Sequence, residues 1–178
     1  MDIRARIEGD MKDPGTLADM IALQDFMEID EKVTISYSIG NVVEQMHRTV
    51  MDDDIAFETI PENREKVNNL FTMYSMSGDP DDFSSMVDYN YEVGLVTALS
   101  KIMSTDDIFS YVEKIDAYID ENFNPELKIN VTGMMVVFRD LVTLIIKSSI
   151  FSITFSLFVI GVIASIFFKR ILWGFLAV

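Results

Sequence analysis

The feature that most constrains this chain is a run of 21 residues, 148–168, that contains no charged side chain. At about 1.5 Å per residue, a helix of this length measures roughly 31 Å, which matches a bilayer hydrocarbon core of about 30 Å. The run is apolar on all sides, with phenylalanine, isoleucine, leucine and valine throughout. Such a run is typical of a lipid-facing helix and predicts one transmembrane span.

Charge divides the chain near the same point. All 29 acidic residues lie at or before Asp140, and only three of the 14 basic residues lie beyond residue 146. Residues 1–146 therefore carry 11 basic against 29 acidic side chains, a net charge of −18. Phosphate backbones repel a domain this acidic, so we do not expect nucleic acid as a partner.

The flanks of the span predict its orientation in the cell membrane. Lys169 and Arg170 close the run, whereas Lys147 alone precedes it. Basic residues concentrate on the cytoplasmic side of membrane proteins. We therefore expect residues 1–147 to be extracytoplasmic and the Lys169-Arg170 end to be cytoplasmic.

The part of the chain before the span alternates between strand and helix patterns. Alternation of apolar and polar residues predicts four strands, at residues 3–7, 33–37, 86–99 and 127–131. Apolar residues at helical spacing predict four helices, at residues 14–29, 39–50, 61–76 and 108–119. Helix start signals precede most of these helices: Asp13-Pro14, Ser38, Pro61 and the capping-box pattern Ser104-Thr105-Asp106-Asp107.

This order predicts an α+β domain over residues 1–133. Two β-α-β halves suit a ferredoxin-like, split βαβ sheet with helices on one face. The intervening helices, residues 39–76, would form an insertion or a neighbouring lobe. After Gly133 the helical pattern continues through a junction, residues 134–147, into the span without a flexible linker. We expect one helix of about 35 residues, followed by a cytoplasmic turn and the start of another hydrophobic segment over 169–178.

Several stretches resemble the resistance-nodulation-division (RND) superfamily, in particular its MMPL-type exporters of hydrophobic molecules and lipids. Residues 7–14 and 33–46 resemble strand-to-helix passages of a porter domain. The most specific likeness is to the end of a porter domain entering the second transmembrane helix, and it is carried by Val131-Thr132-Gly133, Arg139-Asp140-Leu141, the apolar run and Phe168-Lys169-Arg170.

Members of this family are proton-driven transporters with about a dozen transmembrane helices. The resemblance therefore implies that this chain is one part of such a transporter. The coupling acidic residues lie in helices not present in this chain. We therefore expect a fragment, a split gene product or an incomplete reading frame. Its partners would be the lipid bilayer, the remaining helices and a hydrophobic or lipid substrate, and an oligomer is possible. The alternative is a membrane-anchored extracytoplasmic sensor or binding module.

The remaining histidine, aspartate and methionine residues are expected to be structural rather than functional. The lone His47 is expected at a surface or interface, and Asp52–Asp54 and Asp79/Asp81/Asp82 in solvated loops, since neither set has the spacing of a calcium loop. The twelve methionines, Met73/Met76 and Met134/Met135 included, are expected to fill the core rather than to bind metal. The sequon at Asn130 is expected to be silent in a buried strand.

Small residues within the span form a candidate helix-packing set: Ser149, Ser152, Ser156, Gly161 and Ser165. Small side chains let membrane helices approach closely, although serine and glycine are also simply tolerated there. With no cysteine, no nucleophile–base pair and no phosphate-binding glycine loop, the sequence predicts no enzyme activity, cofactor or metal site.

The predicted orientation is testable because the chain has no cysteine of its own. Asp81→Cys, expressed with an upstream transmembrane helix, should react with a membrane-impermeant maleimide on intact cells. Labelling that appears only after lysis would reverse the topology.

Overall fold

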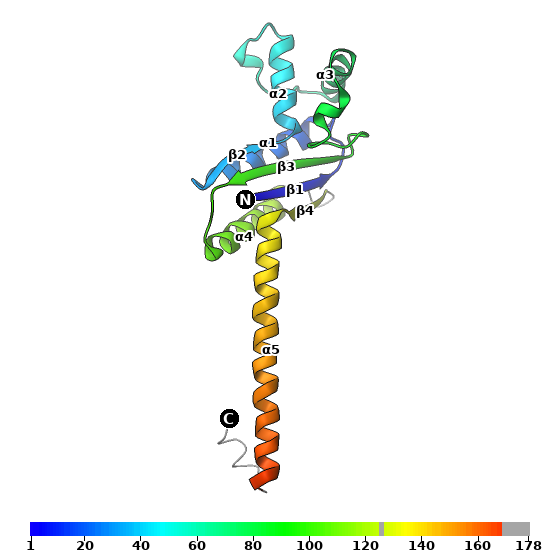
Figure 1. Cartoon of the computed structure of the whole chain (residues 1–178). Coiled ribbons are helices and arrows are strands. Elements are labelled where there is room, and N and C mark those ends of the chain that lie inside the picture. Colours follow the sequence, from blue (N-terminus) through cyan, green and yellow to red (C-terminus); the bar gives the residue numbers. More distant parts are fainter. Residues whose placement is uncertain (125–126, 169–178) are drawn as a thin grey trace. The chain divides into compact units, whose positions relative to one another are not determined.

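The structure is a computed structural model that describes residues 1–124 and 127–168 (Figure 1). The chain divides into two compact units, Met1–Val137 and Phe138–Val178. The described elements follow in the order β1 (Asp2–Glu8), α1 (Pro14–Glu28), β2 (Val33–Tyr37), α2 (Ile39–Val50), η1 (Ile55–Phe57), α3 (Arg64–Ser77), η2 (Pro80–Phe83), β3 (Val93–Ser100), α4 (Thr105–Asn122), β4 (Lys128–Thr132) and α5 (Met134–Phe168).

One antiparallel sheet organises the first unit. Its strand order is β2-β3-β1-β4, so the four predicted strands are confirmed to lie in one sheet of a mixed α+β domain. β1 is paired on both sides: Arg4 lies opposite Thr97 of β3 and Thr132 of β4. Because the N-terminal strand is central, the sheet joins segments from both ends of the unit.

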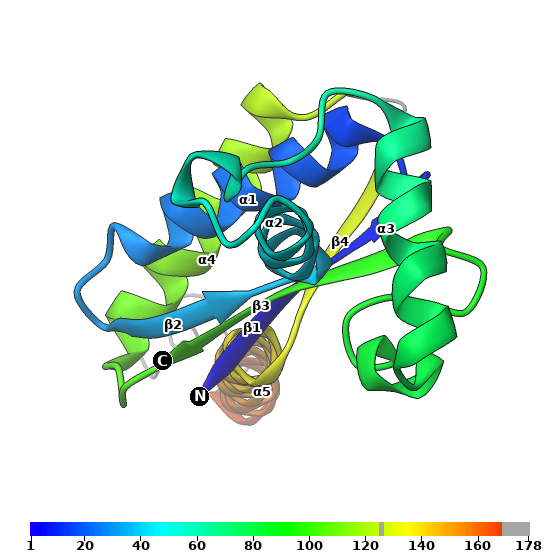
Figure 2. The ribbon, with the colours of Figure 1, turned by 90° about the horizontal axis from the view of Figure 1, so that it is seen from above.

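The core lies between the sheet and two helices. Ile3, Ala5 and Ile7 of β1 are fully buried, whereas Arg4 between them is exposed. Figure 2 shows α1 and α4 on the same side of the sheet. These two helices are joined by a hydrogen bond, 3.0 Å long, from the Tyr111 hydroxyl to the Met27 carbonyl oxygen. One face of the sheet is therefore apolar and covered by helices.

Side chains cap the helices where the sequence predicts. Asp13 accepts a hydrogen bond from the backbone N–H of Thr16 at 3.0 Å, and Pro14 follows it at the first helical position. Both Ser38 and Ser104 form complete capping boxes, with Asn41 and Asp107 as their partners. These bonds satisfy N–H groups that the helix itself leaves without partners.

The predicted start of the third helix is wrong by three residues. α3 begins at Arg64, because Asn63 supplies the cap and accepts from the Lys66 N–H at 2.9 Å. Pro61 is buried but lies outside the helix. A proline can begin a helix, but a side chain that accepts from the first turn defines its start more strongly.

The predicted strand over 86–99 is also wrong in its first half, since β3 spans Val93–Ser100. Before it the chain turns back, and only Val87 forms a bridge, to Gly94. The Asp88 carboxylate causes the turn by accepting from the N–H groups of Glu92 and Val93, both at 2.7 Å. The alternation of Tyr89 and Tyr91 with polar residues is therefore typical of a strand, but the hydrogen bonds of the Asp88 side chain hold this segment in a turn.

Gly133 joins the sheet to the last helix. Its φ of +107° lies in a region that residues with a Cβ rarely adopt. An added Cβ would lie 2.8 Å from the Asp2 carbonyl oxygen and 3.0 Å from the Ile3 Cα. α5 starts at the next residue, where the Met134 N–H donates to the Asp2 carboxylate at 3.3 Å and Met135 is fully buried.

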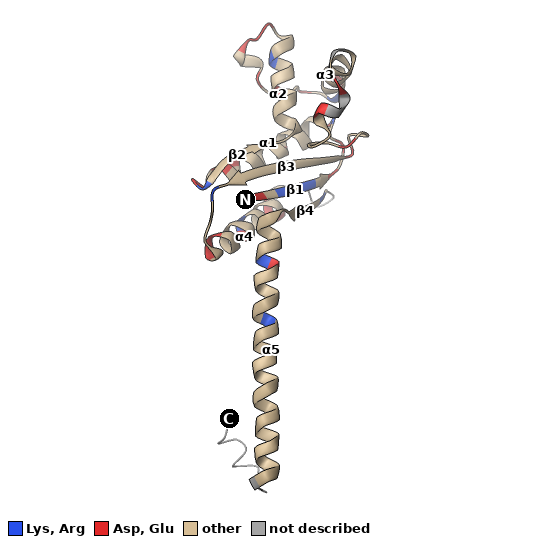
Figure 3. Cartoon of the chain, in the orientation of Figure 1, with Lys and Arg blue, Asp and Glu red and all other residues tan. Residues whose placement is uncertain are grey.

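α5 continues unbroken from Met134 to Phe168, as predicted. Its segment Met134–Phe167 is long and apolar enough to cross a membrane, and the most hydrophobic window is not buried. Figure 3 shows the charged residues of this helix confined to its first half. One long apolar helix indicates membrane association. The predictions for Lys169, Arg170 and the rest of 169–178 concern residues outside the described part of the chain.

Gly133→Ala should destabilise the first unit by about 1–3 kcal/mol, because it forces an L-residue into a strained conformation against β1. Gly9→Ala is the matched control, since its Cβ would meet only the flexible tip of the Leu127 side chain. Denaturation of both variants in detergent micelles measures the difference. Equal stability of the two variants would contradict the role given to Gly133.

The cap of α4 predicts a pH dependence. Hydrogen bonds from the Lys32 ammonium, at 2.7 Å, and from Ser104 lower the pKa of Asp107 from 3.8 to about 2. The stabilisation is therefore complete above pH 3.8 and is lost as the pH falls towards 2. Carboxyl NMR should show a titration midpoint near 2 that Lys32→Met moves towards 3.8. A wild-type midpoint near 3.8 would refute the ion pair.

Candidate functional site

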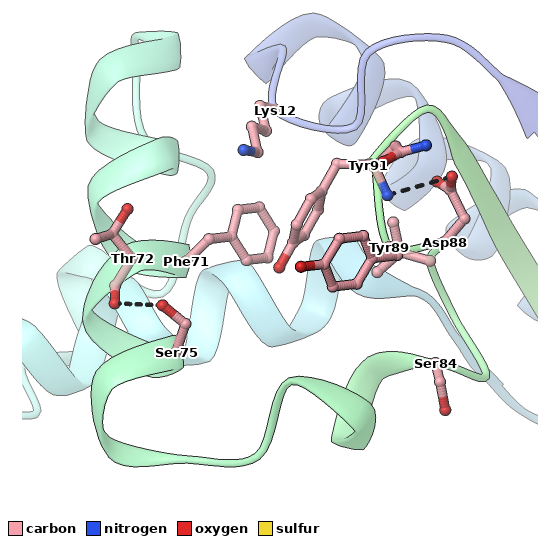
Figure 4. A pocket seen from close by; sticks show the side chains of 10 residues that line it. Lys12, Phe71, Thr72, Ser75, Ser84, Asp88, Tyr89 and Tyr91 are labelled. Atoms are coloured by element: carbon pink, nitrogen blue, oxygen red, sulfur yellow. Dashed lines mark hydrogen bonds between the residues drawn. The ribbon is translucent and has the colours of Figure 1, made fainter.

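The candidate site is an open cavity of about 540 Å³ in the first unit, here named the aromatic pocket. It lies between α3 and the turn that precedes β3 (Figure 4). Its lining residues are Lys12, Phe71, Thr72, Ser75, Ser84, Val87, Asp88, Tyr89, Asn90 and Tyr91. A volume of this size falls in the range of small-molecule sites in proteins.

Backbone hydrogen bonds fix the turn that carries the two tyrosines. Tyr91 has a φ of +60°, an unusual conformation for a bulky residue, held by the Asp88 bonds on one side. On the other side, the Met11 N–H donates to the Tyr91 carbonyl oxygen at 2.9 Å, and the Gly9 N–H to that of Glu92 at 2.9 Å. The turn is thereby joined to the β1–α1 loop, which places Tyr91 against α3.

Three side chains form the centre of the pocket. The rings of Phe71 and Tyr91 lie 4.6 Å apart at 47°. The Lys12 Nζ lies 4.6 Å from the centroid of the Tyr91 ring, within the range of a cation–π interaction. Burial, and then the nearby Tyr89, raise the pKa of Tyr91, so its hydroxyl is neutral at physiological pH. The pocket thus combines aromatic faces with one ammonium group.

A second depression, of about 400 Å³, adjoins the first and shares Lys12, Asn90 and Tyr91 with it. Here Arg64 of α3 forms an ion pair with Asp10 at 2.6 Å. Burial alone would raise the pKa of Asp10, but the bonds from Arg64 and the Lys12 N–H lower it overall. The pair is well exposed and screened by solvent, so its role is to orient α3 rather than to stabilise the fold.

The residues predicted from the family resemblance lie elsewhere. Val131 and Thr132 end β4 opposite Ala5 and Arg4, and Gly133 forms the close turn described above. Arg139 forms an ion pair with its neighbour Asp140 at 3.0 Å on α5. Val131, Thr132 and Gly133 therefore lie at the sheet–helix junction, and Arg139 and Asp140 lie further along α5. None of the five is among the described residues that line the aromatic pocket.

The small residues of the span occupy two stripes of α5. At about 100° per residue, Ser149, Ser152 and Ser156 share one side of the helix, and Gly161 and Ser165 fall on another. The Ser165 hydroxyl donates to the Gly161 carbonyl oxygen at 2.8 Å. That bond lies within the helix, so Ser165 already uses its donor without a neighbouring helix.

The sequence predicts His47 at a surface or an interface, and the structure excludes the surface position. The side chain is only 9% exposed, and its Nδ1–H donates to the Thr59 carbonyl oxygen at 2.8 Å. The ring also contacts Phe57 edge-on, with centroids 5.7 Å apart. His47 holds the segment after α2 against that helix, a contact that helical periodicity does not reveal.

The predicted solvated position is confirmed for Asp52–Asp54, which lie in the turn between α2 and η1. Asp52, Asp53 and Asp54 are exposed, and Asp54 caps η1 by accepting from the Ala56 N–H at 2.9 Å. Asp82 accepts a short hydrogen bond from the Tyr74 hydroxyl, 2.5 Å long. Among the described residues, no cluster of three or more histidine, cysteine, aspartate or glutamate side chains is arranged to hold a metal ion.

Two further predictions are corrected. Met135 is buried as expected, but Met73, Met76 and Met134 are 53%, 83% and 57% exposed, because they lie on outward sides of α3 and α5. The sequon residue Asn130 is exposed, since β4 is an edge strand that presents alternate residues to solvent. Burial therefore does not prevent its modification.

The aromatic pocket is not predicted from the sequence, because the alternating pattern predicts a strand at Tyr89 and Tyr91. The signal was present in the residues 88–92, Asp-Tyr-Asn-Tyr-Glu. Aspartate and asparagine two residues apart favour side-chain-to-backbone bonds and turns. Comparison with known proteins adds no assignment: no family model, curated protein or solved structure matches the chain.

Asp88→Ala should destabilise the turn by about 1–3 kcal/mol, because it leaves the N–H groups of Glu92 and Val93 without their acceptor. Asp88→Asn is the matched control, since its amide oxygen still accepts. Hydrogen exchange at these two amides measures the effect. Equal protection in wild type and Asp88→Ala would refute the proposed basis of the pocket wall.

Proposed function

We propose that the chain is the porter domain and second transmembrane helix of an RND/MMPL-type exporter of hydrophobic molecules or lipids. The Met1–Val137 unit would be a ferredoxin-like, split βαβ domain on the extracytoplasmic side. This fold is supported by two β-α-β halves whose strands take the order β2-β3-β1-β4.

The observation that carries the proposal is the direct passage from sheet to apolar helix. β4 ends at Thr132, Gly133 makes the turn, and α5 begins at Met134 with its next residue in the core. A merely tethered module would be joined by a glycine-, serine- or proline-rich stalk. A helix that starts within a folded domain is suited to carry movement between that domain and the bilayer.

Transport would use energy captured outside this chain. Residues 148–168 contain no ionisable side chain, so this helix supplies no proton relay. Partner helices, on the same or another chain, would carry the coupling groups, and their movement would open and close a path for substrate between porter lobes. The partners would therefore be the bilayer, those helices and the hydrophobic substrate.

The second candidate is a membrane-anchored extracytoplasmic sensor or binding module. It is favoured by the aromatic pocket, whose volume and lining suit a small molecule. In that case ligand binding beside Lys12 would bias the conformation of the domain, and α5 would pass the signal to a cytoplasmic partner.

Dye accumulation distinguishes the two. If the chain belongs to an exporter, cells deleted for its coding sequence should accumulate more Nile red than wild-type cells, and a protonophore should abolish the difference. Unchanged accumulation in the deletion would contradict export of hydrophobic molecules and favour the sensor.

The role of α5 can be tested in the same assay. Val142→Pro removes a helical hydrogen bond and clashes with the preceding turn, at a cost of about 3 kcal/mol or more. It should abolish complementation, whereas Val142→Ala, which keeps the helix, should restore export. Equal export by the two variants, at equal expression, would refute a mechanical role for the helix.

A further inference from the structure

We propose that the aromatic pocket binds a small planar aromatic acid, with its ring against Tyr89 and Tyr91 and its carboxylate beside the Lys12 ammonium. The inference rests on the Met1–Val137 unit alone. It therefore holds for either function proposed above, and a failure of the dye assay leaves it standing.

Several polar groups in the pocket remain available as hydrogen-bond donors. Thr72 and Ser75 already donate to carbonyl oxygens of α3, at Asn68 and Thr72, both at 2.8 Å. In contrast, the ammonium of Lys12 and the hydroxyls of Tyr89 and Tyr91 have no hydrogen-bond partner among the described residues. Figure 4 shows both tyrosine hydroxyls pointing towards α3. Such a set suits a ligand rich in acceptors.

Among the described lining residues Asp88 is the only carboxylate, and it does not oppose such a ligand strongly. Asp88 directs one oxygen to the N–H groups of Glu92 and Val93 and the other to that of Asn90 at 3.4 Å. Its charge is therefore held by backbone dipoles within the turn. Lys12 is half-buried and forms no ion pair within 4 Å among the described residues, and the carboxylate on which its charge acts is that of Asp10, in the adjoining depression. Its ammonium is therefore the cation of this pocket that a ligand can pair with.

The charge of the domain limits the ligand to one negative charge. A net charge of −18 over residues 1–146 repels anions at long range, and a single ammonium compensates a single carboxylate. A phosphate ester or a dicarboxylate would bring a second charge without a partner. A monocarboxylate is therefore favoured over nucleotides and other polyanions.

The aromatic side chains favour a flat ring over an alkyl chain. Tyr89 is 91% exposed, so one large aromatic side chain lies open to solvent at the pocket. Phe71 is buried and packs against the Tyr91 ring. Stacked or edge-on ring pairs contribute beyond the burial of area alone, so a planar ligand gains more here than a flexible chain of equal size.

The test is titration calorimetry of the full chain in detergent micelles with 2-naphthoate. Lys12→Met should weaken binding about tenfold or more, because it removes the charged donor but keeps most of the stem. Tyr91→Asn should weaken it similarly, since asparagine tolerates the positive φ without the ring. Lys12→Arg should retain binding. Uptake of the probe by micelles is common to all variants and cancels in their comparison.

Lys66→Met is the matched control, because Lys66 is an exposed lysine of α3 that lies outside the lining of the pocket. It should bind as the wild type does. The proposal is overturned if wild type does not bind 2-naphthoate, or if Lys12→Met binds within twofold of wild type while its circular dichroism spectrum is unchanged. It is also overturned if 2-naphthylmethylamine or decanoate binds more tightly than 2-naphthoate.

Discussion

The two-sided pairing of β1 is the interaction on which the rest of the structure depends. Its backbone bonds hold β3 on one side and β4 on the other, and its inward residues Ile3, Ala5 and Ile7 are fully buried beneath α1 and α4. The same strand also meets the base of the apolar helix, because Asp2 accepts from the Met134 N–H. One strand therefore links the sheet, the core and the beginning of α5.

The site depends on the same strand through the loop that leaves it. Bonds from Gly9 and Met11 to the turn before β3 place Tyr91 against Phe71, and the Lys12 ammonium follows onto the Tyr91 ring. The pocket is thus built from segments distant in sequence that the antiparallel pairing of β1 and β3 brings together. The result is an exposed aromatic surface with one ammonium group beside it.

Sequence patterns predicted the parts of the fold that local chemistry determines. The caps at Ser38 and Ser104, the four strand cores and the long helix after Gly133 all rest on local periodicity or side-chain-to-backbone bonds. The predictions that proved wrong concern residues whose positions depend on hydrogen bonds across a turn or a loop. Tyr91 alternates as in a strand, but Asp88 turns the chain, and His47 is buried by a segment that follows it. Pairwise contacts of this kind leave no period in the sequence, so periodicity alone could not predict the pocket, and only the aspartate and asparagine of residues 88–92 signal the turn that builds it.

The central claim is that the apolar helix begins inside the cooperative core of the domain. Native-state hydrogen exchange tests it most directly, at the Val137 amide, which donates to the Gly133 carbonyl oxygen at 3.1 Å, and at the Ala5 amide in β1. If the claim holds, both amides exchange only through global unfolding and show the same opening free energy. Exchange at Val137 with a much lower opening free energy than at Ala5 would show that the helix is attached to the domain without being part of its core.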